Sequence, residues 1–170
     1  MAIENDNLFK PLFCHITMHE EEIKERREYI VKSSAPFVDA RGRIDNYEMI
    51  FPVNMANIIT SKAGSLRANH FHPEQLQQCL LVTGKYISVF KDLTLPGAQL
   101  RLQVIMAGDL SVMPPMVAHT MIFLEDSILV NLVPGNRDHD KFGQHTVPYL
   151  LVKPEETQAF IDKHKAELSK

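Results

Sequence analysis

The sequence predicts an all-β domain, folded as a barrel or a sandwich. Short runs rich in β-branched and aromatic residues follow one another between residues 37 and 134, and turn signals such as Pro-Gly and Pro-Pro separate them about every eight to twelve residues. No helical stretch separates these runs, as βαβ units would require. The predicted strand runs are 37–50, 52–61, 66–72, 77–84, 85–93, 100–108, 109–115, 119–126 and 127–134.

Helices are predicted only at the two ends of this β region. Acidic residues open the segment 18–33 and basic residues close it, an order that suits the dipole of a short helix. At the other end, Pro154 stands at the first turn of a predicted C-terminal helix. We therefore expect an N-terminal arm and helix over 1–34, one barrel over 35–152 and a C-terminal helix over 153–170.

Length and composition limit the classes of function. The chain has 170 residues, enough for one domain with its own core, and a formal net charge of -3. Its basic residues are not gathered into one block, which argues against a nucleic-acid partner. The apolar runs are too short to cross a bilayer, and the N-terminus lacks the pattern of a signal peptide. Cys14 and Cys79 form no CxxC pair, so we expect reduced thiols in a cytoplasmic protein with no membrane partner.

Two neighbouring histidines and a third far downstream predict a metal site. His70 and His72 are two apart in a predicted strand, so their imidazoles point to the same face. Gln77 opens the next strand run, and His119 follows a later strand marked by Gly and Pro residues. Imidazole and amide groups from separate strands of a small barrel suit a mononuclear divalent metal. In the alternative interpretation, the two histidines are hydrogen-bonded polar residues in a barrel without a metal.

The spacing of these residues resembles the first of the two motifs that mark the cupin superfamily. That motif runs Gly, five residues, His-x-His, three or four residues, Glu, six residues, Gly. In this chain Gly64 is followed by five residues, the two histidines, four residues, Gln77, six residues and Gly84. Each spacing agrees, and only the Glu is replaced.

The second cupin motif runs Gly, five residues, Pro-x-Gly, two residues, His, and the segment from Gly108 to His119 is similar to it. Here Met116 stands in place of the motif's last Gly. The two motifs lie in register, and the resemblance spans roughly residues 35–152. It implies a single-domain double-stranded β-helix, the jelly-roll cupin barrel, with short N- and C-terminal helices.

The resemblance also implies that one divalent metal ion is held by His70, His72, Gln77 and His119. A carboxamide ligand is neutral, so the full charge of the ion remains available for Lewis-acid chemistry. Some cupins that tautomerise uronates or cyclise polyketides are similar in using Gln at this position. Zn, Ni, Mn, Fe and Co all suit these ligand types. Cupins of the deoxysugar-nucleotide epimerase kind work without a metal, and a metal-free site is therefore the alternative.

Residues beside the histidines resemble those of cupins that act on nucleotide-linked keto-sugars. The run Arg67-Ala68-Asn69-His70 is similar to their Arg-Gly-x-His signature, with Ala in place of Gly. The resemblance implies that His70 is the base and that Arg67 and Asn69 bind the substrate. Residues 39–48 resemble the Asp-x-Arg-Gly opening of the same proteins. One nitrogen of His70 cannot both bind a metal and act as a free base, so the two roles compete.

Isomerising such a sugar requires removal of a proton alpha to a ketone and stabilisation of the enediolate. A histidine with a pKa near neutral suits the first task, and Tyr47 and Tyr86 are candidates for the acid that returns the proton. We therefore predict a metal-binding sugar isomerase or epimerase, with another cupin activity (tautomerase, lyase or dioxygenase) or a non-catalytic sugar-binding cupin as the alternatives. Because cupins commonly pair through an N-terminal strand, we expect a homodimer with contacts in residues 8–16.

Overall fold

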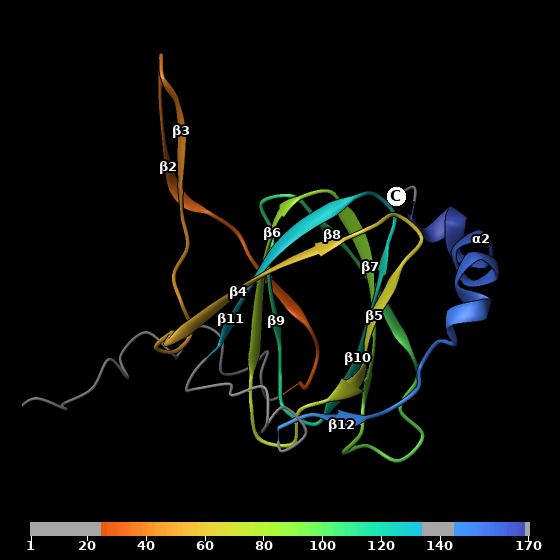
Figure 1. Cartoon of the computed structure of the whole chain (residues 1–170). Helices are drawn as coiled ribbons and strands as arrows, with labels where there is room; N and C mark the ends of the chain where they lie inside the picture. The colour runs from red at the N-terminus through yellow and green to blue at the C-terminus, as the bar shows by residue number, and fades with distance from the viewer. Residues whose placement is uncertain (1–24, 134–144, 169–170) are drawn as a thin grey trace, which may run out of the picture.

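Eight of the nine predicted strand runs, with two short strands that were not predicted, pair into two five-stranded antiparallel sheets that face each other as a barrel (Figure 1). The remaining run, 37–50, was predicted as part of the barrel and instead forms a separate hairpin. This computed structural model describes residues 25–133 and 145–168. The first sheet has the order β1 (Tyr29–Val31), β9 (Leu110–Met113), β6 (Gln77–Thr83), β11 (Ser127–Val133) and β4 (Met55–Ser61). The second sheet has the order β12 (Val147–Pro148), β5 (Leu66–Phe71), β10 (Val117–Phe123), β7 (Lys85–Asp92) and β8 (Arg101–Met106). The predicted all-β barrel is therefore confirmed.

Side chains that alternate along the strands fill the barrel and cover its outside. Tyr86, Phe123 and Leu81 belong to a core cluster between the sheets, to which both sheets contribute. Ile87 and Val89 turn to the outer face, because successive side chains point to opposite faces of a strand. They are fully buried there. Burial on both faces explains why β7 and β10 carry nearly continuous apolar runs in the sequence.

The C-terminal segment supplies the cover over this outer face. A 3-10 turn, η3 (Pro154–Glu156), leads into helix α2 (Thr157–Leu168), and Pro154 stands at the first turn as predicted. The Thr157 hydroxyl donates a hydrogen bond of 2.8 Å to the Pro154 carbonyl. Phe160 and Ile161 pack against the outer cluster of the second sheet. Neither α2 nor η3, the helices that the structure describes, is long and apolar enough to span a membrane.

The N-terminal segment corrects the prediction of a helix over 18–33. Tyr29–Val31 form strand β1, which pairs antiparallel with β9, and residues 18–24 lie outside the described parts of the chain. Tyr, Ile and Val favour a half-buried strand, and pairing with β9 outweighs the charge order that favoured a helix. Alternation along this strand places Glu28 and Ile30 on the inner face of the sheet.

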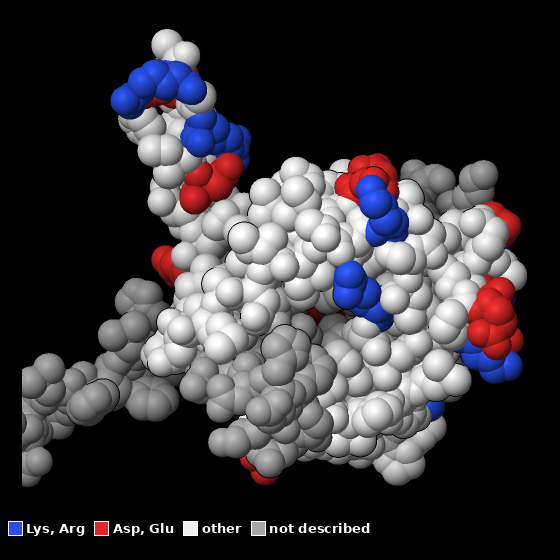
Figure 2. Space-filling view, in the orientation of Figure 1, with Lys and Arg blue, Asp and Glu red and all other residues white. Residues whose placement is uncertain are grey.

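A two-stranded hairpin of β2 (Ser34–Asp39) and β3 (Gly42–Asn46) projects away from the barrel (Figure 1). At its tip the Arg41 guanidinium lies 2.6 Å from the Asp39 carboxylate. Figure 2 shows that the hairpin carries many charges, whereas the barrel face in this view carries few. Phe37 and Ile44 are cross-strand partners and are 54% and 57% exposed. The hairpin therefore presents an apolar pair to its surroundings.

Candidate active site

Three histidines meet inside the barrel. His70 lies on β5, His72 follows the end of that strand, and His119 lies on β10 opposite His70. One ring nitrogen from each lies within 4.8 Å of the other two. The ring centroid of His70 is 4.8 Å from each of the other two centroids. The structure therefore brings together the three imidazoles that the motif spacing singled out.

A β-bulge in β5 turns these histidines inward. Leu66 packs in the outer cluster beneath the C-terminal segment, and a regular strand would place His70 on that same outer face. The pairing with β10 shifts register between Ala68 and His70, and Asn69 is the extra residue. Ala68 and Asn69 have left-handed backbones, with φ of 69° and 55°. One extra residue reverses the alternation, so His70 and His72 face the interior.

Asn69 is held by the chain that follows the barrel. Its side-chain oxygen accepts hydrogen bonds from the backbone N–H groups of Leu151 at 3.0 Å and Val152 at 3.3 Å, and its amide nitrogen donates to the Val152 carbonyl at 2.8 Å. These contacts fasten the bulge to the C-terminal segment. The second N–H of the Asn69 amide is the donor that remains for the predicted contact with substrate.

Backbone carbonyls fix the orientation of two of the imidazoles. His72 Nδ1 donates to the His145 carbonyl at 2.7 Å, and His119 Nδ1 donates to the Val117 carbonyl at 3.1 Å. A proton on Nδ1 leaves the Nε2 lone pair available to the centre of the site. Burial, and then the neighbouring His70 and His72, hold the pKa of His119 well below its usual value. His119 is therefore neutral at physiological pH and suited to bind a metal.

Gln77 lies on the inner face of the opposite sheet. Its amide nitrogen donates to the Asn131 side-chain oxygen at 3.4 Å, which distinguishes the two ends of the carboxamide. Its oxygen is buried and, like His119 Nε2, has no hydrogen-bond partner among the described residues. Buried polar atoms seldom remain unpaired, so a ligand for both is expected. Neutral imidazoles with an amide oxygen fit a divalent metal ion.

Two residues that stand where the motifs have glycine adopt the left-handed backbone that glycine adopts readily. Met116 has φ of 61° and Ala68 has φ of 69°, in the left-handed region that costs a residue with a Cβ about 1 kcal/mol. The Met116 N–H donates to the His72 carbonyl at 2.8 Å, which joins the two motifs directly.

Arg67 connects the two sheets at the barrel edge. Its Nε donates to the Ser61 hydroxyl at 2.7 Å, and a terminal nitrogen donates to the Thr60 carbonyl at 2.8 Å. The residue is exposed. Both partners lie on β4, so part of the guanidinium is used to hold the sheets together, and the predicted contact with substrate would have to use its remaining donors.

The two predicted tyrosines lie on different faces of the barrel wall. Tyr86 is fully buried in the inner core, where its ring centroid lies 5.4 Å from that of Phe123. Burial, followed by the nearby Glu28, raises its pKa well above the usual value. Tyr47 packs in the outer cluster against β1 and β9, and its hydroxyl donates to the Gly108 carbonyl at 2.8 Å. Only Tyr86 therefore shares the interior with the histidines.

Two polar residues inside the barrel were missed from the sequence. Asn131 accepts hydrogen bonds from Gln77 and from the buried thiol of Cys79. Glu28 is 3% exposed, and the Ser111 hydroxyl donates to it. The aromatic and β-branched run Tyr29-Ile30-Val31 was a strand signal, but the charges of the surrounding segment suggested a solvated helix.

No protein-family model and no curated protein matches this sequence. Solved structures do match it. The sugar 3,4-ketoisomerase QdtA from Thermoanaerobacterium thermosaccharolyticum, in complex with TDP, is 16% identical with a TM-score of 0.60, over 82% of this chain and 96% of that one. The chain has the cupin fold.

Other matching structures of this cupin fold have related activities. The dTDP-4-dehydrorhamnose 3,5-epimerase from Bacillus anthracis, with TDP and PPi bound, is 20% identical with a TM-score of 0.59, over 75% of this chain and 81% of that one. ChmJ, a 3'-monoepimerase from Streptomyces bikiniensis in complex with dTDP-quinovose, is 20% identical with a TM-score of 0.55, over 66% of this chain and 65% of that one. The structural neighbours are thus enzymes of nucleotide-sugar chemistry.

Proposed function

We propose that this protein is an isomerase or epimerase of a nucleotide-linked keto-sugar, and that its reaction takes place at the three histidines. The observation that carries the proposal is the convergence of these imidazoles, at least one of them held neutral, inside a cupin barrel. The substrate class is supported by the neighbours, one of which is a ketoisomerase in complex with TDP-4-keto-6-deoxyglucose.

His70 is assigned as the base. Among the three imidazoles it alone is half-buried, whereas His72 and His119 are each 1% exposed. A ligand that enters the barrel therefore reaches His70 more readily than the other two. His70 would take the proton from the carbon next to the ketone, and a proton would return either from His70 to the neighbouring carbon or from a second acid to the opposite face of the first carbon. Return to the opposite face epimerises the sugar, and return to the neighbouring carbon moves the carbonyl.

A divalent metal ion would be held by His72, His119 and the Gln77 oxygen. This division leaves His70 free of the ion and resolves the competition between its two predicted roles. When bound, the ion supplies Lewis-acid polarisation of the substrate carbonyl. The residues of the chain orient the sugar and move the proton. The Nδ1 contacts to backbone carbonyls hold the two ligand imidazoles in place before any ligand arrives.

Deuterium wash-in tests the proposal. Protein incubated with TDP-4-keto-6-deoxyglucose in deuterated water is expected to place deuterium on a carbon next to the C4 ketone, as followed by proton NMR. Related nucleotide-linked 4-keto-sugars are tested in the same way. Failure of every sugar to exchange, while the same sugars raise the melting temperature of the protein, would contradict the enzymatic proposal. That outcome would identify a sugar-binding cupin without this activity.

We also propose that the protein is a homodimer and that the projecting hairpin is part of the contact. The previously expected contact, residues 8–16, lies outside the described residues. A two-stranded hairpin is marginally stable alone in water and needs further strands or packing. The exposed Phe37 and Ile44 pair supplies an apolar surface for a second copy.

Light scattering is expected to give about twice the chain mass of 19.4 kDa. The double change Phe37→Asp with Ile44→Asp should shift the mass to that of one chain. Leu95→Asp, which changes an equally exposed apolar residue outside the hairpin, should leave the dimer intact. A wild-type particle with the mass of one chain would refute the dimer.

A further inference from the structure

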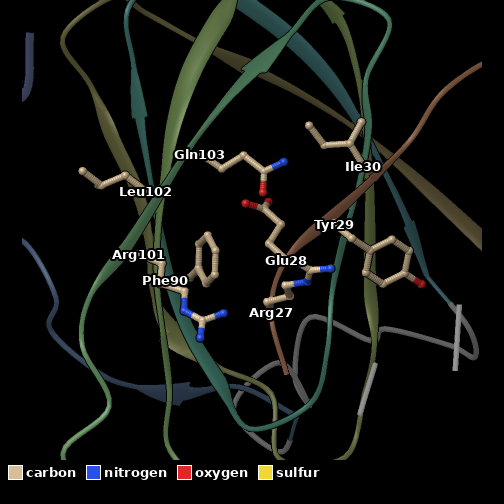
Figure 3. A pocket seen from close by; sticks show the side chains of 8 residues that line it. All are labelled: Arg27, Glu28, Tyr29, Ile30, Phe90, Arg101, Leu102 and Gln103. Atoms are coloured by element: carbon tan, nitrogen blue, oxygen red, sulfur yellow. The ribbon is translucent and has the colours of Figure 1, made fainter. Parts of the chain in front are cut away.

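A cavity of about 550 Å³ opens beside the first strand and between the sheets. Its walls come from β1 and the residues just before it and from β7 and β8, as Figure 3 shows. The polar residues of its lining are Arg27, Glu28, Arg101 and Gln103. Figure 3 shows the Glu28 and Gln103 side chains directed into this space. The cavity thus has one acidic group among two cationic groups and an amide.

One oxygen of the Glu28 carboxyl group lacks a hydrogen-bond partner among the described residues. The Ser111 hydroxyl donates to Oε1 of its carboxyl group. The second oxygen, Oε2, is buried and has no hydrogen-bond partner within residues 25–133 and 145–168. A buried carboxylate oxygen without a partner is costly unless the group is protonated or a ligand donates to it. The carboxyl is therefore placed to exchange a proton with a ligand.

The same cavity adjoins the histidine site. Phe90, one of its lining residues, is the cross-strand partner of His119. Opposite residues of an antiparallel pair have neighbouring side chains on one face, so Phe90 and His119 lie side by side on the inner wall. Phe90 thus forms a wall that is common to the cavity and to the histidine centre.

The pairing of the first sheet gives the height of Glu28 in the barrel. Tyr29 pairs with Val112, and Gln77 pairs with the next residue of β9, Met113. Antiparallel pairing therefore places Glu28, which precedes Tyr29, at the level of Gln77 and two strands away, or about 10 Å between backbones. Glu28, from the first sheet, and His70, from the second, therefore extend into the same interior.

We infer that Glu28 is a second acid–base residue of this site, one that serves the carbonyl oxygen of the substrate while His70 serves the carbon. The inference rests on the proposed function. As His70 takes the proton from carbon, the neutral Glu28 carboxyl donates its proton to the carbonyl oxygen, which gives a neutral enediol. In the second half, the Glu28 carboxylate takes an enediol O–H proton and protonated His70 delivers one to carbon. Both residues end in their starting forms.

The surroundings of Glu28 suit this exchange near neutral pH. Burial raises its pKa to about 7, and the Ser111 and Ser88 hydroxyls partly offset the rise. Charged and titratable groups that face it from the neighbouring elements are Arg27, Arg101, Asp109 and Tyr86. Acid and base forms are therefore both populated at physiological pH, as an acid–base residue requires.

The test compares Glu28→Gln with the wild-type protein. Gln keeps the size of the side chain and cannot donate a carboxyl proton, so deuterium wash-in should fall about 100-fold. TDP should still raise the melting temperature of the variant, because the change leaves the rest of the cavity intact. In the wild-type protein the wash-in rate should decrease as pH rises above about 7, where the acid form of Glu28 is lost. Glu155→Gln changes an exposed residue and serves as the control. Its wash-in rate, its pH dependence and its stabilisation by TDP should equal those of the wild type.

A second readout does not depend on activity. A carboxyl whose pKa is raised on folding stabilises the folded state at low pH relative to high pH, and this contribution is lost as pH rises through about 7. The melting temperature of Glu28→Gln should therefore rise relative to that of the wild type between pH 5 and pH 8. A difference that stays constant with pH would overturn the inference.

The outcomes separate the two proposals. Wild-type exchange that Glu28→Gln lowers less than threefold would overturn the role of Glu28 and leave the proposed function standing. Absence of exchange in the wild-type protein with every keto-sugar would overturn the proposed function and this role with it. Loss of exchange in the variant with retained TDP binding supports the inference.

Discussion

His70→Gln is expected to slow deuterium wash-in by at least about 100-fold, because general-base catalysis by a positioned side chain contributes that much or more. Gln retains hydrogen-bonding groups but cannot take a proton near neutral pH. His70 is half-buried, so the change should be tolerated by the fold. The rate of label appearance at the carbon next to the ketone is measured by NMR, and the melting temperature is recorded for the same samples.

The matched control for His70 is His164→Gln, which changes a histidine on α2, outside the barrel. This variant should catalyse deuterium wash-in at the wild-type rate. The metal content of each preparation is measured in parallel. Loss of exchange with an unchanged metal content identifies His70 as the base, whereas loss of both assigns it to the metal shell. Exchange at the wild-type rate in His70→Gln would refute the catalytic assignment.

Gly84→Ala is expected to destabilise the protein by about 3–5 kcal/mol, the upper end of single-residue effects. Gly84 has φ of +89°, and an added Cβ would lie 2.1 Å from the Ser127 hydroxyl oxygen and 2.7 Å from the Asp126 carbonyl oxygen. Ser127 cannot easily give way, because its hydroxyl donates to the Glu125 carbonyl and accepts from the Lys85 N–H. Urea unfolding at a fixed protein concentration gives the loss of stability.

Gly97→Ala separates the backbone cost from the clash. Gly97 has a similar φ of +77°, but nothing lies within 4 Å of its added Cβ. This variant should lose only about 1 kcal/mol, from the left-handed conformation alone. Equal losses of unfolding free energy in the two variants would mean that the turn at Gly84 can relax. The close approach of the chain to Ser127 would then not constrain the fold.

The part of the site that follows from local pattern could be predicted. Strand alternation and turn spacing are properties of short segments, so the strands and the shared face of His70 and His72 were accessible from the sequence. Their convergence with His119 followed from the resemblance in motif spacing. The bulge at Asn69 could not be read in the same way. Asn in a left-handed conformation has no unique sequence signal, and its partners, Leu151 and Val152, lie far along the chain.

The remaining errors have a common cause in long-range pairing. Glu28 enters the barrel because β1 pairs with β9, a contact between residues about 83 positions apart. The charges around it favoured a solvated helix, and no local signal identifies the partner strand. Tyr47 was grouped with Tyr86 as an acid, but it packs on the outer face because its hydroxyl bonds to the Gly108 carbonyl. Tertiary contacts decided both positions.

The central claim is that imidazoles and an amide from separate strands share one centre, and metal titration tests it most directly. Protein purified without an affinity tag and stripped with chelator is titrated with Zn²⁺ or Ni²⁺ by calorimetry. The account predicts one ion per chain for the wild type and for His164→Ala. It predicts at least a 100-fold loss of affinity for a folded His119→Ala. A wild-type protein that binds neither ion, or a His119→Ala variant that binds as tightly as the wild type, would contradict it.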